Sequence, residues 1–142
     1  MDTKPTLPPE TPASAPPRGG IRPHALARVL KLIESRLQEP LLVEDLAREA
    51  CLSPFHFARM FKQSTGQSPH AYLVARRLER ARQMLVASDL SIREVSRLAG
   101  FSTHAHFCSV FRAKTGMTPA AYRRAQRAAA ADVSDAQGDP AR

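Results

Sequence analysis

The sequence predicts an all-α protein in which two helix-turn-helix subdomains are joined by a long linker helix. Three observations support this prediction. Apolar residues recur at three- and four-residue spacing, the order short helix, long helix, long helix occurs twice, and the second half of the chain repeats the first. No stretch has the two-residue alternation of a half-buried strand. We expect about seven helices, all between residues 21 and 127 or shortly after.

The first helix is indicated by one apolar stripe that stops near Pro40. Its members are Leu26, Val29, Leu30, Ile33 and Leu37. Six further helices are predicted in chain order over residues 43–50, 54–65, 69–87, 92–99, 103–115 and 119–129. The helix over 69–87 is the linker between the two subdomains.

Capping residues mark where these helices begin and end. Each of Ser53-Pro54, Ser68-Pro69 and Thr118-Pro119 puts a hydroxyl at the N-cap and proline at the first helical position. Ser91 and Glu94 fit a capping box, in which each side chain bonds the other residue's backbone. Gly66 and Gly116 are placed to end helices in the left-handed conformation.

The internal repeat defines the folding unit. Residues 57–72 and 107–122 align at an offset of 50, with seven of sixteen positions identical, and upstream residues align at an offset of 49. Each copy reads as short helix, tight turn, long helix, over a small core. The expected core residues are Leu46, Leu52, Phe57 and Phe61 in the first copy, and Val95, Phe101, Phe107 and Phe111 in the second. This order is typical of the helix-turn-helix, whose second helix reads the DNA major groove.

The linker helix has a length suited to one DNA molecule. Its 19 residues span about 28 Å at ~1.5 Å per residue, and successive major-groove faces lie about 34 Å apart. We therefore expect two reading helices about one DNA turn apart in one chain, which favours a monomer on DNA.

The predicted organisation has four parts. Residues 1–20 hold six prolines and read as a disordered leader, 21–87 form the first subdomain with its linker helix, 88–127 form the second, and 128–142 read as a disordered tail. No segment is apolar enough to span a bilayer or serve as a secretory signal. Two cysteines without paired spacing indicate a reducing compartment, so we expect the cytoplasm.

Charge points to a polyanionic partner. The formal net charge is +8, and residues 91–127 alone carry seven basic side chains against Glu94. Lys and Arg near phosphates release condensed counterions, so this distribution favours nucleic acid.

Two stretches carry a family resemblance. Residues 53–62 (SPFHFARMFK) with Thr65, Gly66, Ser68, Pro69 and Tyr72, and the matching residues 100–123, resemble the two halves of the AraC/XylS-type DNA-binding domain. The resemblance implies a seven-helix, homeodomain-like domain that binds double-stranded promoter DNA. Since residues 1–20 leave no room for a ligand-binding domain, the chain looks like the stand-alone members, such as the multiple-antibiotic-resistance and superoxide-response activators. Activation of transcription, RNA polymerase as partner and no cofactor are therefore expected.

The resemblance also places the base contacts. On the first reading helix they fall at Phe55, Ala58 and Arg59. Arg59 is the leading candidate because guanidinium can bond guanine bidentately, while Phe55 either contacts thymine methyls or packs in the core. On the second reading helix the candidates are His104, Ala105, Cys108 and Ser109. Many relatives carry arginine where this chain has Ser109, so weaker base reading is expected there.

Phosphate contacts are expected from exposed basic side chains near the reading helices. The candidates are His56, Lys62, Arg112, Lys114, Arg123 and Arg124. Such contacts position a protein on DNA without specifying sequence. The alternative for each is an ordinary solvated charge.

Three alternatives compete with DNA reading. His104 and Cys108 lie one helical turn apart and are zinc-type ligands, but a structural zinc site has four, so no metal is predicted. A module that docks a protein partner would not need the basic excess of residues 91–127. An enzyme is the poorest alternative, because no nucleophile with its base and no Gly-rich phosphate loop is visible.

Overall fold

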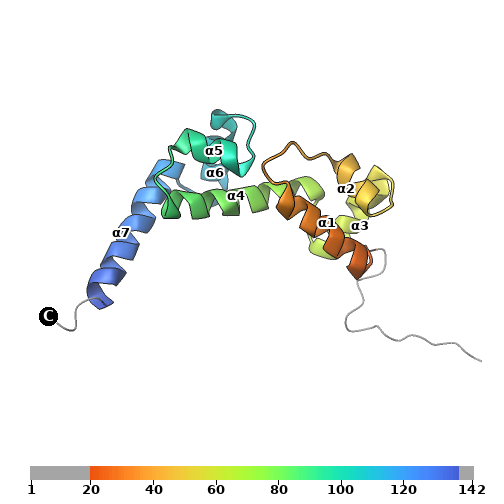
Figure 1. The fold of residues 1–142 in the computed structure, drawn as a ribbon, viewed down its shortest axis with the longest axis horizontal. Coiled ribbons are helices and arrows are strands. Elements are labelled where there is room, and N and C mark those ends of the chain that lie inside the picture. Colours follow the sequence, from red (N-terminus) through yellow and green to blue (C-terminus); the bar gives the residue numbers. More distant parts are fainter. Residues whose placement is uncertain (1–19, 138–142) are drawn as a thin grey trace, which may run out of the picture. The chain divides into compact units, whose positions relative to one another are not determined.

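The computed structural model describes residues 20–137, and within them it contains helices and no strand (Figure 1). The helices are α1 (Pro23–Ser35), α2 (Val43–Glu49), α3 (Pro54–Thr65), α4 (Pro69–Ala87), α5 (Ile92–Ala99), α6 (His104–Thr115) and α7 (Pro119–Gln137). The predicted all-α class with seven helices is confirmed. The expected leader lies outside the described residues except for Gly20.

The largest difference from the prediction is at the C-terminal end. Helix α7 continues to Gln137, so the expected tail is wrong for residues 128–137. The reason is the alanine run over 128–131, because alanine has the highest intrinsic helix propensity. Residues 124–132 are all exposed, so propensity rather than packing accounts for this extension.

The predicted caps set the helix ends. Ser53 Oγ accepts a hydrogen bond from the His56 N–H, and the same bond joins Ser68 to Ala71 and Thr118 to Ala121. Ser91 Oγ accepts from the Glu94 N–H, which confirms that half of the expected capping box. Gly66 and Gly116 end α3 and α6 with φ of 86° and 82°, in the left-handed region.

The chain forms two compact units, with the boundary between Arg76 and Arg77. The sequence placed this boundary after residue 87, at the end of the linker helix. The two halves of α4 serve different units instead: Leu73 belongs to the core of the first unit, whereas the buried Leu78, Ala81 and Leu85 belong to the second. Burial, rather than the helix end, decides the division.

The first unit is built around α1, α2 and α3. Its buried residues include Ile21, Val29, Ile33, Leu37, Leu41, Leu46, Phe57, Phe61 and Leu73. Leu52 is half-buried against this cluster, so all four expected core residues of the first copy contribute to it.

The second unit has an equivalent core. The buried residues are Leu78, Ala81, Leu85, Val95, Ala99, Phe101, Phe107 and Phe111. They include all four core residues expected for the second copy. Ser96 is buried as well, and its hydroxyl donates to the Thr103 carbonyl.

Matching aromatic stacks hold the long helix of each copy. In the first unit, the Phe57 and Phe61 ring centroids are 5.4 Å apart, and Tyr72 lies edge-on at 5.4 Å from Phe61. In the second unit, the equivalent distances are 5.6 Å between Phe107 and Phe111 and 5.4 Å from Phe111 to Tyr122. The two copies therefore bury the same face of α3 and of α6.

Candidate nucleic-acid interface

Each unit contains a helix-turn-helix closed in the same way. The Leu52 N–H donates to the Ala47 carbonyl at 2.9 Å, and at an offset of 49 the Phe101 N–H donates to the Ser96 carbonyl at 3.0 Å. Both bonds tie the start of the turn back to the short helix, so α2 with α3 and α5 with α6 form equivalent pairs. The repeat predicted from sequence is thus also a repeat in structure.

Burying one face of α3 exposes the predicted reading face. Phe57 and Phe61 point into the core and are fully buried, while Phe55, Arg59 and Lys62 are exposed. Phe55 is 72% exposed, which removes the alternative that it packs in the core. The Arg59 guanidinium carbon lies 5.9 Å from the Phe55 ring centroid, a cation–π distance that holds the two side chains beside each other.

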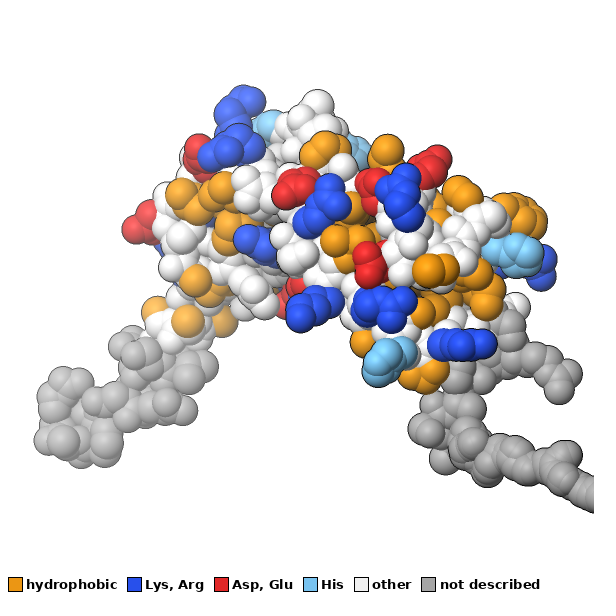
Figure 2. Space-filling model, turned by 45° about the vertical axis from the view of Figure 1, so that its right-hand side comes forward, with side chains coloured by type: hydrophobic (Ala, Val, Ile, Leu, Met, Phe, Trp, Pro, Cys, Tyr) orange, Lys and Arg blue, Asp and Glu red, His pale blue; other side chains and the backbone are white. Residues whose placement is uncertain are grey.

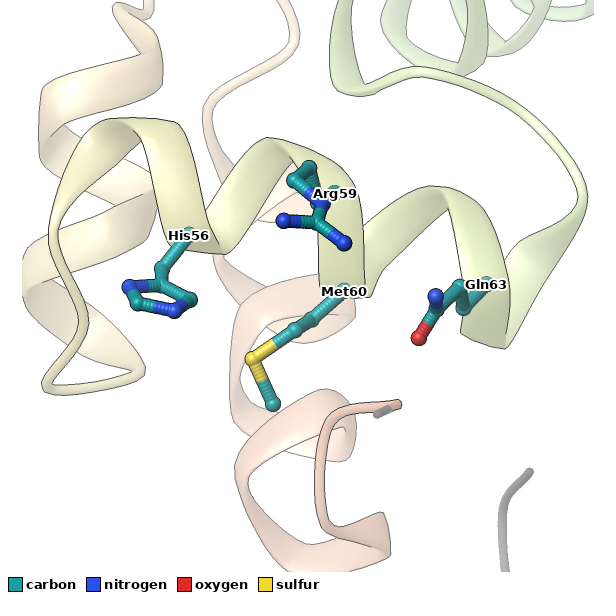
Figure 3. A pocket seen from close by; sticks show the side chains of 4 residues that line it. All are labelled: His56, Arg59, Met60 and Gln63. Carbon is teal, nitrogen blue, oxygen red and sulfur yellow. The ribbon is translucent and has the colours of Figure 1, made fainter. Parts of the chain in front are cut away.

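A shallow depression lies along this same helix. It is lined by His56, Arg59, Met60 and Gln63, all from α3 (Figure 3). Met60 and Gln63 were not among the sequence candidates. The available signal was spacing, because residues 56, 59, 60 and 63 follow the helical pattern of one face. Ala58, a predicted reader, is half-buried.

Helix α6 presents a different set of side chains. Ala105 and Ser109 are exposed, and His104 and Cys108 are half-buried. His104 Nε2 lies 3.6 Å from Cys108 Sγ, so the structure brings these two candidates together. Among the described residues, no group of three or more His, Cys, Asp or Glu side chains is arranged to hold a metal ion.

The exposed basic side chains fall into two groups. Many form ion pairs, such as Arg28 with Glu49 and Arg97 with Glu94. On the face drawn in Figure 2, basic, acidic and hydrophobic side chains lie intermixed. Within residues 20–137, the exposed side chains of the second group form no ion pair. They include the candidates Arg59, Lys62, Arg112, Lys114 and Arg124, and also Arg22, Lys31, Arg80 and Arg93. These charges are available to an external anion.

Arg123 has an internal role that the sequence did not predict. Its guanidinium donates to the carbonyls of Leu85 at 2.8 Å and Ser88 at 3.2 Å, at the end of α4. Arg127 also donates to the Ser88 carbonyl and forms an ion pair with Asp89 at 3.1 Å. The phosphate contact expected for Arg123 stays a prediction, and the structure shows its guanidinium engaged within the second unit.

No described helix is both long and apolar enough to cross a bilayer.

Two helix-turn-helix units, each with an exposed second helix, define a tandem helix-turn-helix protein. A family model described as a helix-turn-helix domain matches residues 46–125.

Solved structures support a narrower assignment. A transcriptional regulator of Chromobacterium violaceum with an AraC-type DNA-binding domain superposes with a TM-score of 0.67 and 37% identity, covering 74% of this chain and 93% of that chain. The DNA-binding domain of AdpA, solved in complex with a target DNA, superposes with a TM-score of 0.71 and is 38% identical in sequence. This match covers 73% of this chain and 94% of the AdpA domain.

Curated relatives match more than half of the chain. The transcriptional regulator ArgR of Pseudomonas aeruginosa is 36% identical over 78 residues, which are 55% of this chain and 24% of ArgR. The regulatory protein PocR of Salmonella typhimurium is 36% identical over 85 residues, which are 58% of this chain and 28% of PocR. The chain thus spans about a quarter of the length of these relatives. It belongs to the AraC-type family of helix-turn-helix proteins, which are DNA-binding transcription regulators and not enzymes.

Proposed function

We propose that the chain binds specific sites in promoter DNA as a transcription activator, with α3 and α6 inserted into successive major grooves. One observation carries this proposal: both helices lie on matching buried phenylalanine pairs and turn their opposite faces to solvent. Exposed basic side chains without ion pairs lie on the same two helices, Arg59 and Lys62 on α3 and Arg112 and Lys114 on α6. The family assignment supports DNA as the partner.

On α3, base reading is assigned to the side chains beside the exposed phenylalanine. Arg59 bonds guanine O6 and N7, Phe55 packs on thymine methyls, and Ala58 allows close approach of the helix. Gln63 extends the same row by one turn, and its amide suits adenine N6 and N7.

On α6, His104, Ala105, Cys108 and Ser109 face the second groove. None of them can form the bidentate guanine contact of an arginine, so we expect this half to add less sequence preference than α3.

Phosphate contacts are assigned to His56, Lys62, Arg112, Lys114, Arg123 and Arg124. Five of these six side chains are exposed, and Arg123 is half-buried. They supply affinity that falls as salt rises.

The 19 residues of α4, about 28 Å long at ~1.5 Å per residue, are the basis for assigning both reading helices to one DNA molecule. A monomer then occupies two boxes about one turn apart, in the cytoplasm, with RNA polymerase as the protein partner in activation. These assignments extend the expectations from the sequence.

Selection from a random double-stranded pool tests the proposal. The purified full chain is used to enrich duplexes, and the best duplex is then titrated against its scrambled form at several salt concentrations. Two enriched boxes about one helical turn apart, with at least ~10³-fold preference over scrambled DNA, are expected. A single box would contradict the two-groove assignment. Binding without an enriched motif would contradict specific recognition altogether.

Arg59→Ala is expected to weaken binding to the selected duplex by about 1–3 kcal/mol and to relax preference at one base position. The matched comparison is Lys62→Ala on the same helix. This variant is expected to weaken binding to the specific and to the scrambled duplex equally. The slope of log affinity against log salt concentration should become shallower by about 1. Equal losses on both duplexes for Arg59→Ala would reassign Arg59 to a phosphate contact.

A further inference from the structure

We propose that His104 and Cys108 form a two-ligand chelate for a thiophilic divalent cation, with Zn²⁺ as the reference ion. The two residues lie at i and i+4 on α6, with Nε2 and Sγ 3.6 Å apart. Both side chains are half-buried, so they are reachable from solvent while their helix is fixed by the buried Phe107 and Phe111.

The separation of the two donor atoms matches what one tetrahedral ion requires. Zinc–sulfur and zinc–nitrogen bonds of about 2.3 Å and 2.05 Å, set at the tetrahedral angle of about 109°, place the two donors about 3.5 Å apart. The distance of 3.6 Å found between Cys108 Sγ and His104 Nε2 is close to this separation.

The chemistry of the pair is compatible with this exchange. When His104 carries its proton on Nδ1, Nε2 offers a lone pair to the Cys108 thiol hydrogen. Zn²⁺ replaces that proton: a zinc–sulfur and a zinc–nitrogen bond form, and one proton leaves to the buffer. Thiolate and imidazole together favour zinc over calcium and magnesium, which prefer oxygen ligands. Two coordination positions stay open to water, so the site is weaker than a closed four-ligand site.

The repeat supplies an internal comparison. At an offset of 50, His104 and Cys108 correspond to Pro54 and Ala58 on α3, which offer no ligand. The other thiol, Cys51, is exposed and belongs to the first unit. His106 is exposed and lies two residues beyond His104, on another side of α6.

The consequence for DNA rests on the proposed function. Both ligands are among the residues assigned to read the second groove. A bound ion with its waters would occupy the edge of α6 that meets the bases, so Zn²⁺ is expected to weaken binding to the selected duplex.

Metal titration without DNA tests the site itself. The reduced full chain is titrated with Zn²⁺ by calorimetry, and with Co²⁺ by absorption, in which a thiolate-to-metal charge-transfer band reports sulfur ligation. One ion per chain is expected, lost in Cys108→Ser and in His104→Ala, and retained in Cys51→Ser and in His106→Ala. Circular dichroism checks that each variant is folded. Absence of binding at severalfold molar excess, or binding that survives Cys108→Ser, would overturn the site.

A second titration tests the consequence for DNA. Duplex affinity is measured with and without Zn²⁺ for each variant against itself, with Mg²⁺ as the control cation. A Zn²⁺-dependent fall in duplex affinity that is confined to chains with both ligands supports the inference. An equal fall in the Cys108→Ser variant overturns the proposed effect of the ion on DNA binding. Because the first titration contains no DNA, failure of the metal site and failure of the proposed function are distinguishable.

Discussion

Cys51 occupies a backbone conformation that favours glycine. Its φ is 59°, in the left-handed region, at the turn between α2 and α3. The equivalent residue in the second unit is Gly100, with φ of 103°. A side chain in this region brings Cβ close to the following carbonyl, a cost that glycine does not have. The first turn therefore stores strain that the second avoids.

Cys51→Gly is expected to raise the free energy of unfolding by about 0.5–1 kcal/mol, the relief of strain less the added flexibility of the unfolded chain. Cys51 is exposed, so little packing is lost. Urea denaturation of the purified chain measures the change. The reverse substitution, Gly100→Ala, should lower stability, and a lower stability of Cys51→Gly would contradict the strain argument.

Asp45 links the start of α2 to pH. The Leu42 N–H donates to its carboxylate at 3.1 Å, and this bond lowers the pKa of Asp45, with Arg48 contributing further. A carboxyl whose pKa is lowered by folding stabilises the fold above its ordinary value of about 3.9. That contribution is lost as pH falls through the lowered value.

The Asp45→Ala variant should therefore be less stable than the natural chain at neutral pH, by a margin that shrinks as pH falls below about 3.9. Chemical denaturation across a pH series measures the margin. Asp45→Asn, which keeps an acceptor oxygen but cannot ionise, separates the charge from the hydrogen bond. A margin that does not change with pH would refute the role of the charge.

At the scale of residues, the sequence predicts which side chains of a helix are buried better than it predicts the roles of the exposed side chains. Phe57 and Phe61 were identified because helical spacing and the repeat both place them inward. The sequence leaves two positions open for Phe55, because an aromatic residue next to a helix start suits either the core or the surface, and the structure places it on the surface. Gln63 and the internal role of Arg123 were missed, since neither exposure along a helix face nor a bond to Leu85 is written in local sequence.

At the scale of elements, α4 and α7 are joined by side-chain hydrogen bonds. Some of these bonds are accepted by backbone carbonyls at the C-terminal end of α4. The Arg123 guanidinium donates to two carbonyls near the end of α4, and the Arg82 guanidinium donates to the Tyr122 hydroxyl at 3.2 Å. Carbonyls at a helix C-terminus have no partner within the helix and attract cations. This pairing fixes α7 within the second unit.

Arg123→Met is expected to lower the free energy of unfolding by about 1–2 kcal/mol, because it leaves the part-buried Leu85 carbonyl without its side-chain donor, whereas the Ser88 carbonyl keeps Arg127 as a donor. The matched control is Arg124→Met, the exposed neighbour, whose stability should be nearly unchanged. Thermal and urea unfolding provide the comparison. Equal stability of the two variants would show that the Arg123 bonds contribute little.

Element boundaries were predictable wherever a cap marked them. Serine or threonine before proline located the starts of α3, α4 and α7, and glycine located the ends of α3 and α6. The sequence does not predict the end of α7, because the alanine run is followed by no cap signal.

At the scale of the molecule, Ile21 is the first core residue of the first unit among the residues that the structure describes. This side chain is 2% exposed, and its N–H donates to Ser64 Oγ at 2.8 Å. The repeat predicts the division into two units, but the predicted boundary after residue 87 is wrong, because the boundary lies between Arg76 and Arg77. A helix that is continuous in sequence gives no local sign of which half belongs to which core.

Removal of residues 1–19 is expected to leave the free energy of unfolding nearly unchanged, whereas Ile21→Ala should lower it by about 2–5 kcal/mol through the cavity it creates. Denaturant titration of both variants beside the full chain measures the difference. A large loss on removing residues 1–19 would show that the leader predicted from composition contributes to folding.

The matched aromatic stacks have an evolutionary consequence. The aromatic residues on the inner side of α3 and of α6 are the same, Phe57, Phe61 and Tyr72 in one copy and Phe107, Phe111 and Tyr122 in the other. The outward residues have diverged, with Arg59 opposite Ser109 and Ala58 opposite Cys108. In a gene that holds two such copies, the surface residues of one copy can change while the other copy keeps its function. New regulatory targets can then arise one half at a time, without a new fold.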